Sequence, residues 1–210
     1  KIKNLKVDYN YVEEVIKKYG LEGGSKKISY RIEHSDYQLA AGILRAIFLQ
    51  KKVVKPFSKY FTTAKNMKDN NVFQKKYVDF VLKHKDQLDK AINNNLDRDY
   101  TFSDSAMGQM ERVYLHPGSN KTTETPQYCF MREAIQISMK DGIKAVLHNY
   151  DLFSRKLIVN ASPIRINACC IRNQMSSCFL FSMEDETYGK KDNKKLITTL
   201  CNIIIDVCKN

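Results

Sequence analysis

Six cysteines are the most reactive side chains of this 210-residue sequence, and all of them lie in its last two fifths. Cys169 and Cys170 are adjacent, and Cys178 follows eight residues later. No two cysteines have the Cys-x-x-Cys spacing that places two thiolates on one zinc ion, so a zinc site is not favoured. Buried cysteines usually behave as small apolar side chains, and we expect this of Cys129, Cys201 and Cys208.

The other residue types with catalytic potential form no known motif. The four histidines are scattered, and the sequence contains neither His-Glu-x-x-His nor a glycine loop that could cradle phosphates. Hydrolase and kinase chemistry therefore find no support. A chain of this length does not need disulfides, so the cysteines fit a reducing compartment, and we predict a cytoplasmic location. No apolar run reaches the roughly 18 residues that span a membrane.

Charge is a second feature that could select a partner. The chain carries 35 basic and 23 acidic residues, and residues 1–100 hold most of the excess, with 21 basic and 12 acidic side chains. A basic half can attract phosphate-bearing partners, either nucleic acids or nucleotides. Most of the basic residues are lysines and no RNA-binding motif is present, so solvated helix surfaces explain the charge better.

The elements that must position these residues are mainly helical. Apolar residues recur at helical spacing over residues 8–19, and Gly20 should end this helix. Residues 21–30 contain Gly-Gly-Ser and predict a loop. A second helix should begin at Ser35, with Ser35 and Gln38 forming a capping box, and should end near the first proline of the chain.

Further helices are predicted by the same apolar periodicity along most of the chain. They cover the regions around 73–81, 88–92, 107–114, 127–138 and 142–157. After Pro163 the pattern changes to short apolar runs, of which residues 179–183 are the best strand candidate, whereas residues 196–207 again favour a helix. The periodicity therefore predicts one mainly helical domain that runs into a mixed region.

One stretch resembles a known family specifically. Its first block reads Asn-Ala-Ser-Pro-Ile-Arg-Ile-Asn-Ala over residues 160–168, and its second reads Gln-Met-Ser-Ser-Cys-Phe-Leu over residues 174–180. They resemble Ala-Ser-Pro-Thr-Leu-Phe-Asn-Ala-Gly and Gln-Leu-Ser-Ser-Cys-Phe-Leu of the class I ribonucleotide reductase large subunit, at the same separation. Two blocks in register are more specific than either block alone.

Shorter matches to the same family extend upstream, so the resemblance covers about residues 33–188. They are His-Ser-Asp-Tyr at 34–37, Asp-Arg-Asp-Tyr at 97–100, Met-Glu-Arg-Val-Tyr-Leu at 110–115, Thr-Pro-Gln at 125–127, Met-Arg at 131–132 and Tyr-Asp-Leu-Phe-Ser at 150–154. The chain also departs from the family. Ile164, Arg165 and Ile166 stand where the family has Thr-Leu-Phe, and Cys169-Cys170 stand where it has Gly-Thr.

The resemblance implies a fold and an order of domains. Residues 1–30 would be a remnant of, or part of, the family's ATP-cone, which they resemble in one helix at most. Residues 31–160 would form the helical N-terminal domain, and residues 161–210 the truncated start of the reductase barrel. The expected fold class is therefore mainly α, with a helical domain that runs into the first strand or strands of an α/β barrel, beginning after Ser177.

The resemblance also implies an activity, the reduction of ribonucleoside diphosphates to deoxyribonucleoside diphosphates for DNA replication. In that family a thiyl radical abstracts the 3′ hydrogen, and a cysteine pair supplies two electrons as the 2′ hydroxyl leaves as water. Cys178 matches one member of the redox-active pair, and no match to its partner is found in the chain. Ser162 and Ser177 match positions that bind substrate, where hydroxyl groups suit a diphosphate. An allosteric nucleotide site would begin at Glu186, Thr187 and Tyr188.

Partners and cofactors are implied in the same way. The family's large subunit forms a homodimer and works with a small subunit, whose metal centre supplies the radical. ATP and deoxynucleoside triphosphates act as allosteric effectors, and thioredoxin or glutaredoxin is the reductant. We expect no metal on this chain and no membrane.

Two alternatives to an active reductase stay open. The chain holds no match to the radical-bearing cysteine or its helpers, so we expect residues 1–210 alone to be incomplete and inactive. It could then be a catalytically inactive truncated paralogue that acts as a protein or nucleic-acid interaction module. A plain RNA-binding helical domain is the other alternative, and it rests on charge only.

Overall fold

The computed structural model describes residues 2, 4–63, 72–115, 123–171 and 173–178, which contain helices and no strand. The chain divides into two units, Lys1–Met175 and Ser176–Asn210, and residues 176–178 are the described part of the second. The predicted mainly α fold is confirmed for the described residues. The predicted strand at 179–183, the barrel that would follow and the predicted helix at 196–207 lie outside them.

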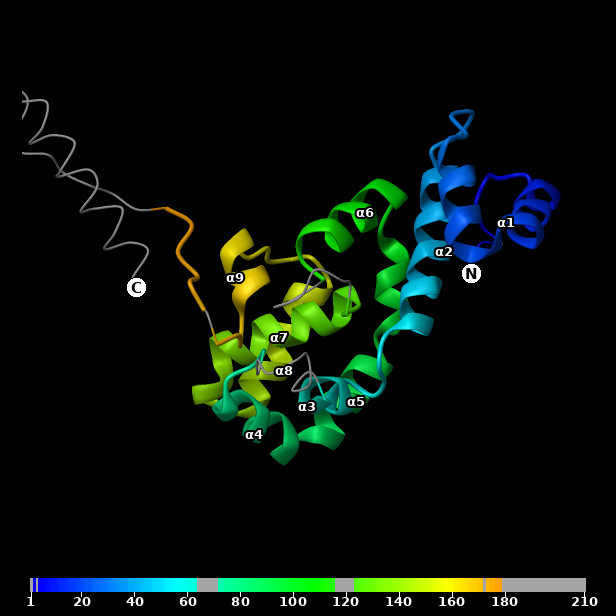
Figure 1. Ribbon diagram of the computed structural model, residues 1–210. Helices are drawn as coiled ribbons and strands as arrows, with labels where there is room; N and C mark the ends of the chain where they lie inside the picture. The colour runs from blue at the N-terminus through cyan, green and yellow to red at the C-terminus, as the bar shows by residue number, and fades with distance from the viewer. Residues whose placement is uncertain (1, 3, 64–71, 116–122, 172, 179–210) are drawn as a thin grey trace, which may run out of the picture. The chain divides into compact units, whose positions relative to one another are not determined.

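The helices predicted between residues 73 and 157 are all present, with small shifts at their ends. In chain order the described helices, with η marking 3₁₀ helices, are α1 Tyr9–Ser29, α2 Asp36–Lys52, α3 Phe57–Thr63, α4 Lys75–Lys83, α5 Lys85–Asn93, η2 Leu96–Thr101, α6 Asp104–Val113, α7 Pro126–Ser138, η3 Met139–Asp141, α8 Ile143–Ser154 and α9 Ser162–Asn167. Helix α7 packs along α8, and α2 packs against α1 and α6 (Figure 1).

The loop predicted over residues 21–30 is wrong, because helix α1 resumes after a kink. Gly20 has a φ of +68°, a left-handed conformation that interrupts the helix, yet helical structure continues to Ser29. In this second arm Ser25 is buried, and its hydroxyl donates to the Asp104 carboxylate at 2.9 Å. Contacts with a distant part of the chain thus outweigh the local preference of the glycines.

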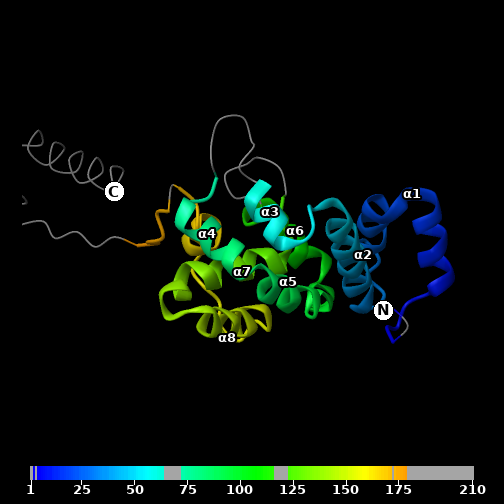
Figure 2. The ribbon, with the colours of Figure 1, turned by 90° about the horizontal axis from the view of Figure 1, so that it is seen from below.

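The prediction of a capping box at the start of α2 is also wrong, because its hydrogen bonds do not form. Ser35 precedes the helix as expected, but its side chain makes no capping hydrogen bond. Gln38 donates instead to the Ser29 carbonyl at the end of α1, at 2.5 Å. This bond helps to hold the two helices together, and they lie side by side in both views (Figures 1 and 2).

Helix α2 contributes to two hydrophobic cores. Its first half packs with α1 in a small core, to which it supplies Tyr37, Ala40, Ala41 and Leu44. Its second half supplies Ala46 and Leu49 to a larger core, which is formed with α3 to α8 and with the residues that follow α9. Because the same helix packs in both cores, α2 connects α1 to the rest of the unit.

Gly42 marks a close approach between α2 and the segment that precedes α6. A Cβ atom at this position would lie 2.1 Å from the Phe102 carbonyl oxygen and 2.8 Å from the Ser103 carbonyl carbon. Both are backbone atoms, which cannot turn away as a side chain would. We therefore expect Gly42→Ala to lower the free energy of unfolding by about 1–3 kcal/mol, as overpacking of a core does, in urea denaturation.

The matched control for Gly42→Ala is Gly24→Ala in α1. Its Cβ atom would lie 3.6 Å from its nearest neighbours, which is ordinary van der Waals contact. Alanine also has a higher helix propensity than glycine, so this variant should be neutral or more stable. Equal losses of stability in the two variants would contradict the close approach at Gly42.

Candidate functional site

Ser162, which the sequence predicts to bind substrate, is the first residue of the short helix α9. Pro163 follows it in the first turn, where proline suits a helix because its missing N–H needs no partner there. The Ser162 residue is exposed, and its Oγ lies 2.9 Å from the hydroxyl oxygen of Tyr114, which directly follows α6. The structure therefore presents this serine at the surface beside a tyrosine hydroxyl.

The C-terminal end of α9 is held by one buried arginine of α7. Arg132 is 0% exposed and donates to the carbonyl oxygens of Arg165, Ile166 and Ala168 at 2.8, 3.3 and 3.0 Å. It also forms a two-point ion pair with Glu124, with nitrogen–oxygen distances of 2.9 and 3.0 Å. Every N–H group of the guanidinium thus has an acceptor, so α9 is fixed to α7 through its backbone.

The ion pair between Arg132 and Glu124 is shielded from water on both sides. Glu124 is 0% exposed and accepts a hydrogen bond from the Tyr60 hydroxyl at 3.1 Å. Burial is the largest single effect and acts to lower the pKa of Arg132. The negative charge and the hydrogen bond of Glu124, with contributions from Cys129 and Cys170, together outweigh it and raise that pKa well above its ordinary value. Burial, with a smaller effect of Glu124, raises the pKa of Tyr60, so its hydroxyl stays a donor.

A second ion pair lies one residue further along α7. Arg165 Nε donates to Glu133 Oε1 at 2.8 Å, and the two side chains are 11% and 0% exposed. Asn160 donates to the other carboxylate oxygen of Glu133 at 2.6 Å. The Arg165 guanidinium lies 5.1 Å from the ring centroid of Tyr114 and 5.5 Å from that of Phe130. The positive charge at a position where the resemblance expects leucine is therefore paired and stacked on aromatic rings.

The backbone at Cys169 has a conformation that favours glycine. Its φ is +62°, in the left-handed region that other residues adopt uncommonly. Its N–H donates to Gln136 Oε1 at 2.7 Å, and its carbonyl accepts from the Gln74 N–H at 2.9 Å. The resemblance places a glycine at this position, so the backbone agrees with the family although the side chain does not.

The described cysteines differ in exposure and therefore in reactivity. Cys129, Cys169 and Cys170 are buried and free, whereas Cys178 is exposed. Burial raises the pKa of all three buried thiols, to about 11 for Cys170, so they stay protonated and are poor nucleophiles. The prediction that Cys129 is buried is confirmed. Cys201 and Cys208, for which the same was predicted, lie outside the described residues.

The described residues contain neither a candidate metal site nor a helix that could span a membrane. No group of three His, Cys, Asp or Glu side chains there could hold a metal ion. None of the described helices combines the length and the apolar character needed to cross a membrane.

The other predicted site residues are placed only in part. Ser162 belongs to the first unit, whereas Ser177 and Cys178 are exposed residues of the second. Glu186, Thr187 and Tyr188 lie outside the described residues. The pairing of Cys178 and the allosteric nucleotide site therefore stay predictions.

The residues that hold α9 in place belong to no recognisable sequence motif. Arg132 and Tyr114 fall inside matched segments, but no pattern assigns a role to either residue or points to Glu124 and Glu133. Their signal is weak but present, since Arg132 and Glu133 are adjacent charges inside a helix whose other residues are largely apolar. Fully buried charges are rare unless they are paired, which makes such positions candidates for a structural network.

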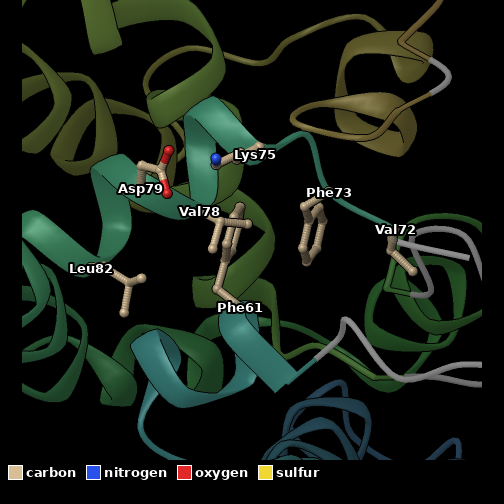
Figure 3. Close-up of a pocket in the computed structure, with 7 residues that line it drawn as sticks. All are labelled: Phe61, Val72, Phe73, Lys75, Val78, Asp79 and Leu82. Atoms are coloured by element: carbon tan, nitrogen blue, oxygen red, sulfur yellow. The ribbon is translucent and has the colours of Figure 1, made fainter.

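The structure also contains a cavity of about 390 Å³ between α3 and α4, which is separate from the residues that hold α9 (Figure 3). It is lined by Phe61, Val72, Phe73, Lys75, Val78, Asp79 and Leu82. The rings of Phe61 and Phe73 stack with their centroids 4.1 Å apart, and Lys75 and Asp79 are the charged groups of the lining. None of the predicted site residues lines this cavity.

Comparison with known proteins identifies relatives of the chain. No protein-family model matches it. It is 36% identical over 161 residues to the ribonucleoside-diphosphate reductase large chain of Schizosaccharomyces pombe. It is 34% identical over 161 residues to the large subunit from Danio rerio, and 34% identical over 159 residues to that from Plasmodium falciparum (isolate Dd2). These matches cover 73–74% of this chain and 19–20% of the relatives, so the chain spans about a fifth of their length.

Over about three quarters of its length, the chain is therefore similar to a part of the large chain of an oxidoreductase. The relatives that it matches there are ribonucleoside-diphosphate reductase large subunits. The resemblance carried by the two sequence blocks is thereby confirmed.

Proposed function

We propose that this chain is part of a ribonucleoside-diphosphate reductase large subunit and contributes to the synthesis of deoxyribonucleoside diphosphates for DNA replication. The identity of 34–36% to such subunits over about three quarters of the chain carries the proposal. Ser162 is exposed, and its helix α9 is attached to α7 by hydrogen bonds from Arg132 to backbone carbonyls. This arrangement supports the proposal, because it offers a fixed surface on which a substrate can be oriented. Rigid support of this kind is what precise substrate binding requires.

In the proposed reaction the residues of this chain bind substrate and supply electrons. Ser162 and Ser177 donate hydrogen bonds to oxygens of the diphosphate or the sugar. Cys178 and a second thiol, for which the chain has no match, become a disulfide. The two electrons and two protons they release replace the 2′ hydroxyl by hydrogen and convert the hydroxyl to water, and an external dithiol then re-reduces the disulfide.

The proposed partners follow from the same activity. A small subunit with a metal centre would supply the radical, a second copy of the large subunit would complete a dimer, and thioredoxin or glutaredoxin would act as the reductant. ATP and deoxynucleoside triphosphates would act as effectors at a site that begins at Glu186, Thr187 and Tyr188. Among the described cysteines, Cys178 is the exposed one, which suits a thiol that must meet both substrate and reductant. We place the protein in the cytoplasm, where thiols are kept reduced.

The test uses the protein expressed from its complete open reading frame, mixed with its small subunit and a dithiol reductant. We expect it to convert a ribonucleoside diphosphate to the deoxy product, and Cys178→Ser to reduce turnover to background, because a hydroxyl cannot form a disulfide. Binding of the diphosphate should persist in this variant. Cys170→Ala, which removes a buried thiol, is the matched control and should keep its activity.

Two outcomes would contradict the proposal. Wild-type turnover in Cys178→Ser would remove the redox role of this thiol. A wild-type protein that neither reduces nor binds diphosphates would favour the inactive interaction module instead.

A further inference from the structure

The Ser162 hydroxyl is paired with a second hydroxyl at the protein surface. Tyr114 directly follows α6, and its oxygen lies 2.9 Å from Ser162 Oγ, with either oxygen able to donate. Two hydroxyls carry two protons, and their mutual hydrogen bond uses one of them. The pair therefore keeps one O–H that can donate outward, in a direction set by the bond between the two oxygens.

The ring of Tyr114 is in turn held by Arg165. The Arg165 guanidinium lies 5.1 Å from the ring centroid of Tyr114 and 5.5 Å from that of Phe130. Its Nε is bonded to the buried carboxylate of Glu133 at 2.8 Å. Phe130 and Glu133 are both buried residues of α7, so this series of contacts runs from the core through Arg165 and Tyr114 to Ser162.

Two further contacts anchor the same segment to α7, one through its backbone and one through the Asn160 side chain. Arg132 donates to the Arg165 carbonyl at 2.8 Å, and Asn160 donates to Glu133 at 2.6 Å. The segment that carries Ser162 is thus attached to α7 before and after this serine. A hydroxyl held in this way loses little rotational freedom when it binds a ligand, which lowers the entropic cost of binding.

We propose that Tyr114 is a positioning residue, which acts through Ser162 to aim a hydroxyl at a phosphate oxygen of a nucleoside diphosphate, and that Arg165 fixes its ring. This inference rests on the proposed function, because it takes Ser162 as a substrate contact. The chain has arginine where the resemblance expects leucine, so the arrangement depends on residues of this chain.

The test compares four variants of the protein from the complete open reading frame, assayed with its small subunit. Tyr114→Phe removes the hydroxyl but keeps the ring under Arg165, so the fold should be retained, as thermal unfolding would verify. We expect the KM for the diphosphate to rise about 3- to 10-fold with kcat nearly unchanged, the factor expected for one hydrogen bond. Tyr9→Phe is the matched control, because it removes another hydrogen-bonded tyrosine hydroxyl, on α1, and its KM should stay that of the wild type.

The combination of Tyr114→Phe with Ser162→Ala separates positioning from a merely structural role. If Tyr114 acts through Ser162, the double variant should have the same KM as Ser162→Ala alone, because the second change removes nothing further. Additive increases in KM would overturn the inference. An unchanged KM in Tyr114→Phe, with a raised KM in Ser162→Ala, would overturn it and leave the proposed function intact. Absence of any diphosphate reduction by the wild type would instead count against the proposed function itself.

Discussion

Arg132→Met is expected to lower the free energy of unfolding of this chain by about 3–5 kcal/mol, because it leaves a buried carboxylate without its partner. Glu124 is 0% exposed, and the Tyr60 hydroxyl would be the remaining described donor to it. The same change removes the donors to the carbonyls of Arg165, Ile166 and Ala168. Methionine matches the length of the arginine stem, so the loss comes mainly from the unpaired polar groups.

Urea denaturation of the variant and the wild type measures this loss. Arg155→Met is the matched control, because the ion pair of Arg155 with Asp151 spans 3.4 Å between side chains that are 54% and 43% exposed. Such an exposed pair contributes about 0–1 kcal/mol. Adding Glu124→Gln to Arg132→Met should restore part of the stability, since it removes the uncompensated charge. Similar losses in Arg132→Met and Arg155→Met would show that the buried pair does not stabilise the fold.

The loss should also be visible locally at the candidate site. Helix α9 has six residues, too few to be stable alone, and its C-terminal carbonyls depend on Arg132. Backbone amides of residues 164–168 should therefore exchange with solvent faster in Arg132→Met than in Arg155→Met. This measurement connects a core interaction to the position of Ser162.

The parts of the fold that the sequence predicted are those coded by local periodicity. Helices α7 and α8 were found because their apolar residues recur every three to four positions, which depends on neighbours in the sequence alone. The loop predicted at 21–30 failed because Ser25 is held by Asp104, far away along the chain. No local pattern contains that contact.

The candidate site also combines residues that the sequence can predict with residues that it cannot. Ser162 could be predicted because it lies in a sequence block that resembles a known family, whereas the residues that contact it in space lie far away along the chain. Arg132 contacts carbonyls 33 to 36 residues further along the chain, and a backbone acceptor has no side-chain signature in the sequence. The residue type at Cys169 does not indicate its left-handed backbone, and only the glycine that the resemblance places at this position points to it.

A buried carboxyl, Asp99, should make the stability of the fold depend on pH. Asp99 is 0% exposed, and its two oxygens accept hydrogen bonds from Gln50 at 3.1 Å and Gln127 at 3.0 Å. The Tyr100 and Tyr150 hydroxyls orient these two amides, at 2.9 and 2.8 Å. The amide hydrogen bonds favour the charged form, but burial dominates and raises the pKa of Asp99 to about 7.

The direction of the pH dependence follows from comparing folded and unfolded states. An aspartate in an unfolded chain has a pKa of about 3.9. Below about pH 4 the carboxyl is protonated in both states, and between pH 4 and the folded pKa of about 7 the folded state alone keeps the proton. Stability from this group is therefore fully present below pH 4 and is lost as the pH rises to about 7. A difference of about 3 in pKa corresponds to a loss of about 4 kcal/mol.

Asp99→Asn keeps the shape of the side chain without its charge, so its stability relative to the wild type should increase by up to about 4 kcal/mol from pH 4 to pH 8. Urea denaturation across this pH range measures the difference in unfolding free energy between the variant and the wild type. The sign of its pH dependence distinguishes Asp99 from carboxyls whose pKa is lowered, such as Asp151. A hydrogen bond from Arg98 lowers the pKa of Asp151, so that group contributes with the opposite sign. Asp97→Asn, an exposed carboxyl on the same 3₁₀ helix, is the matched control and should follow the wild-type curve. If the stability difference between Asp99→Asn and the wild type did not change with pH, the glutamine amides would hold Asp99 charged throughout, and burial would not be the dominant effect.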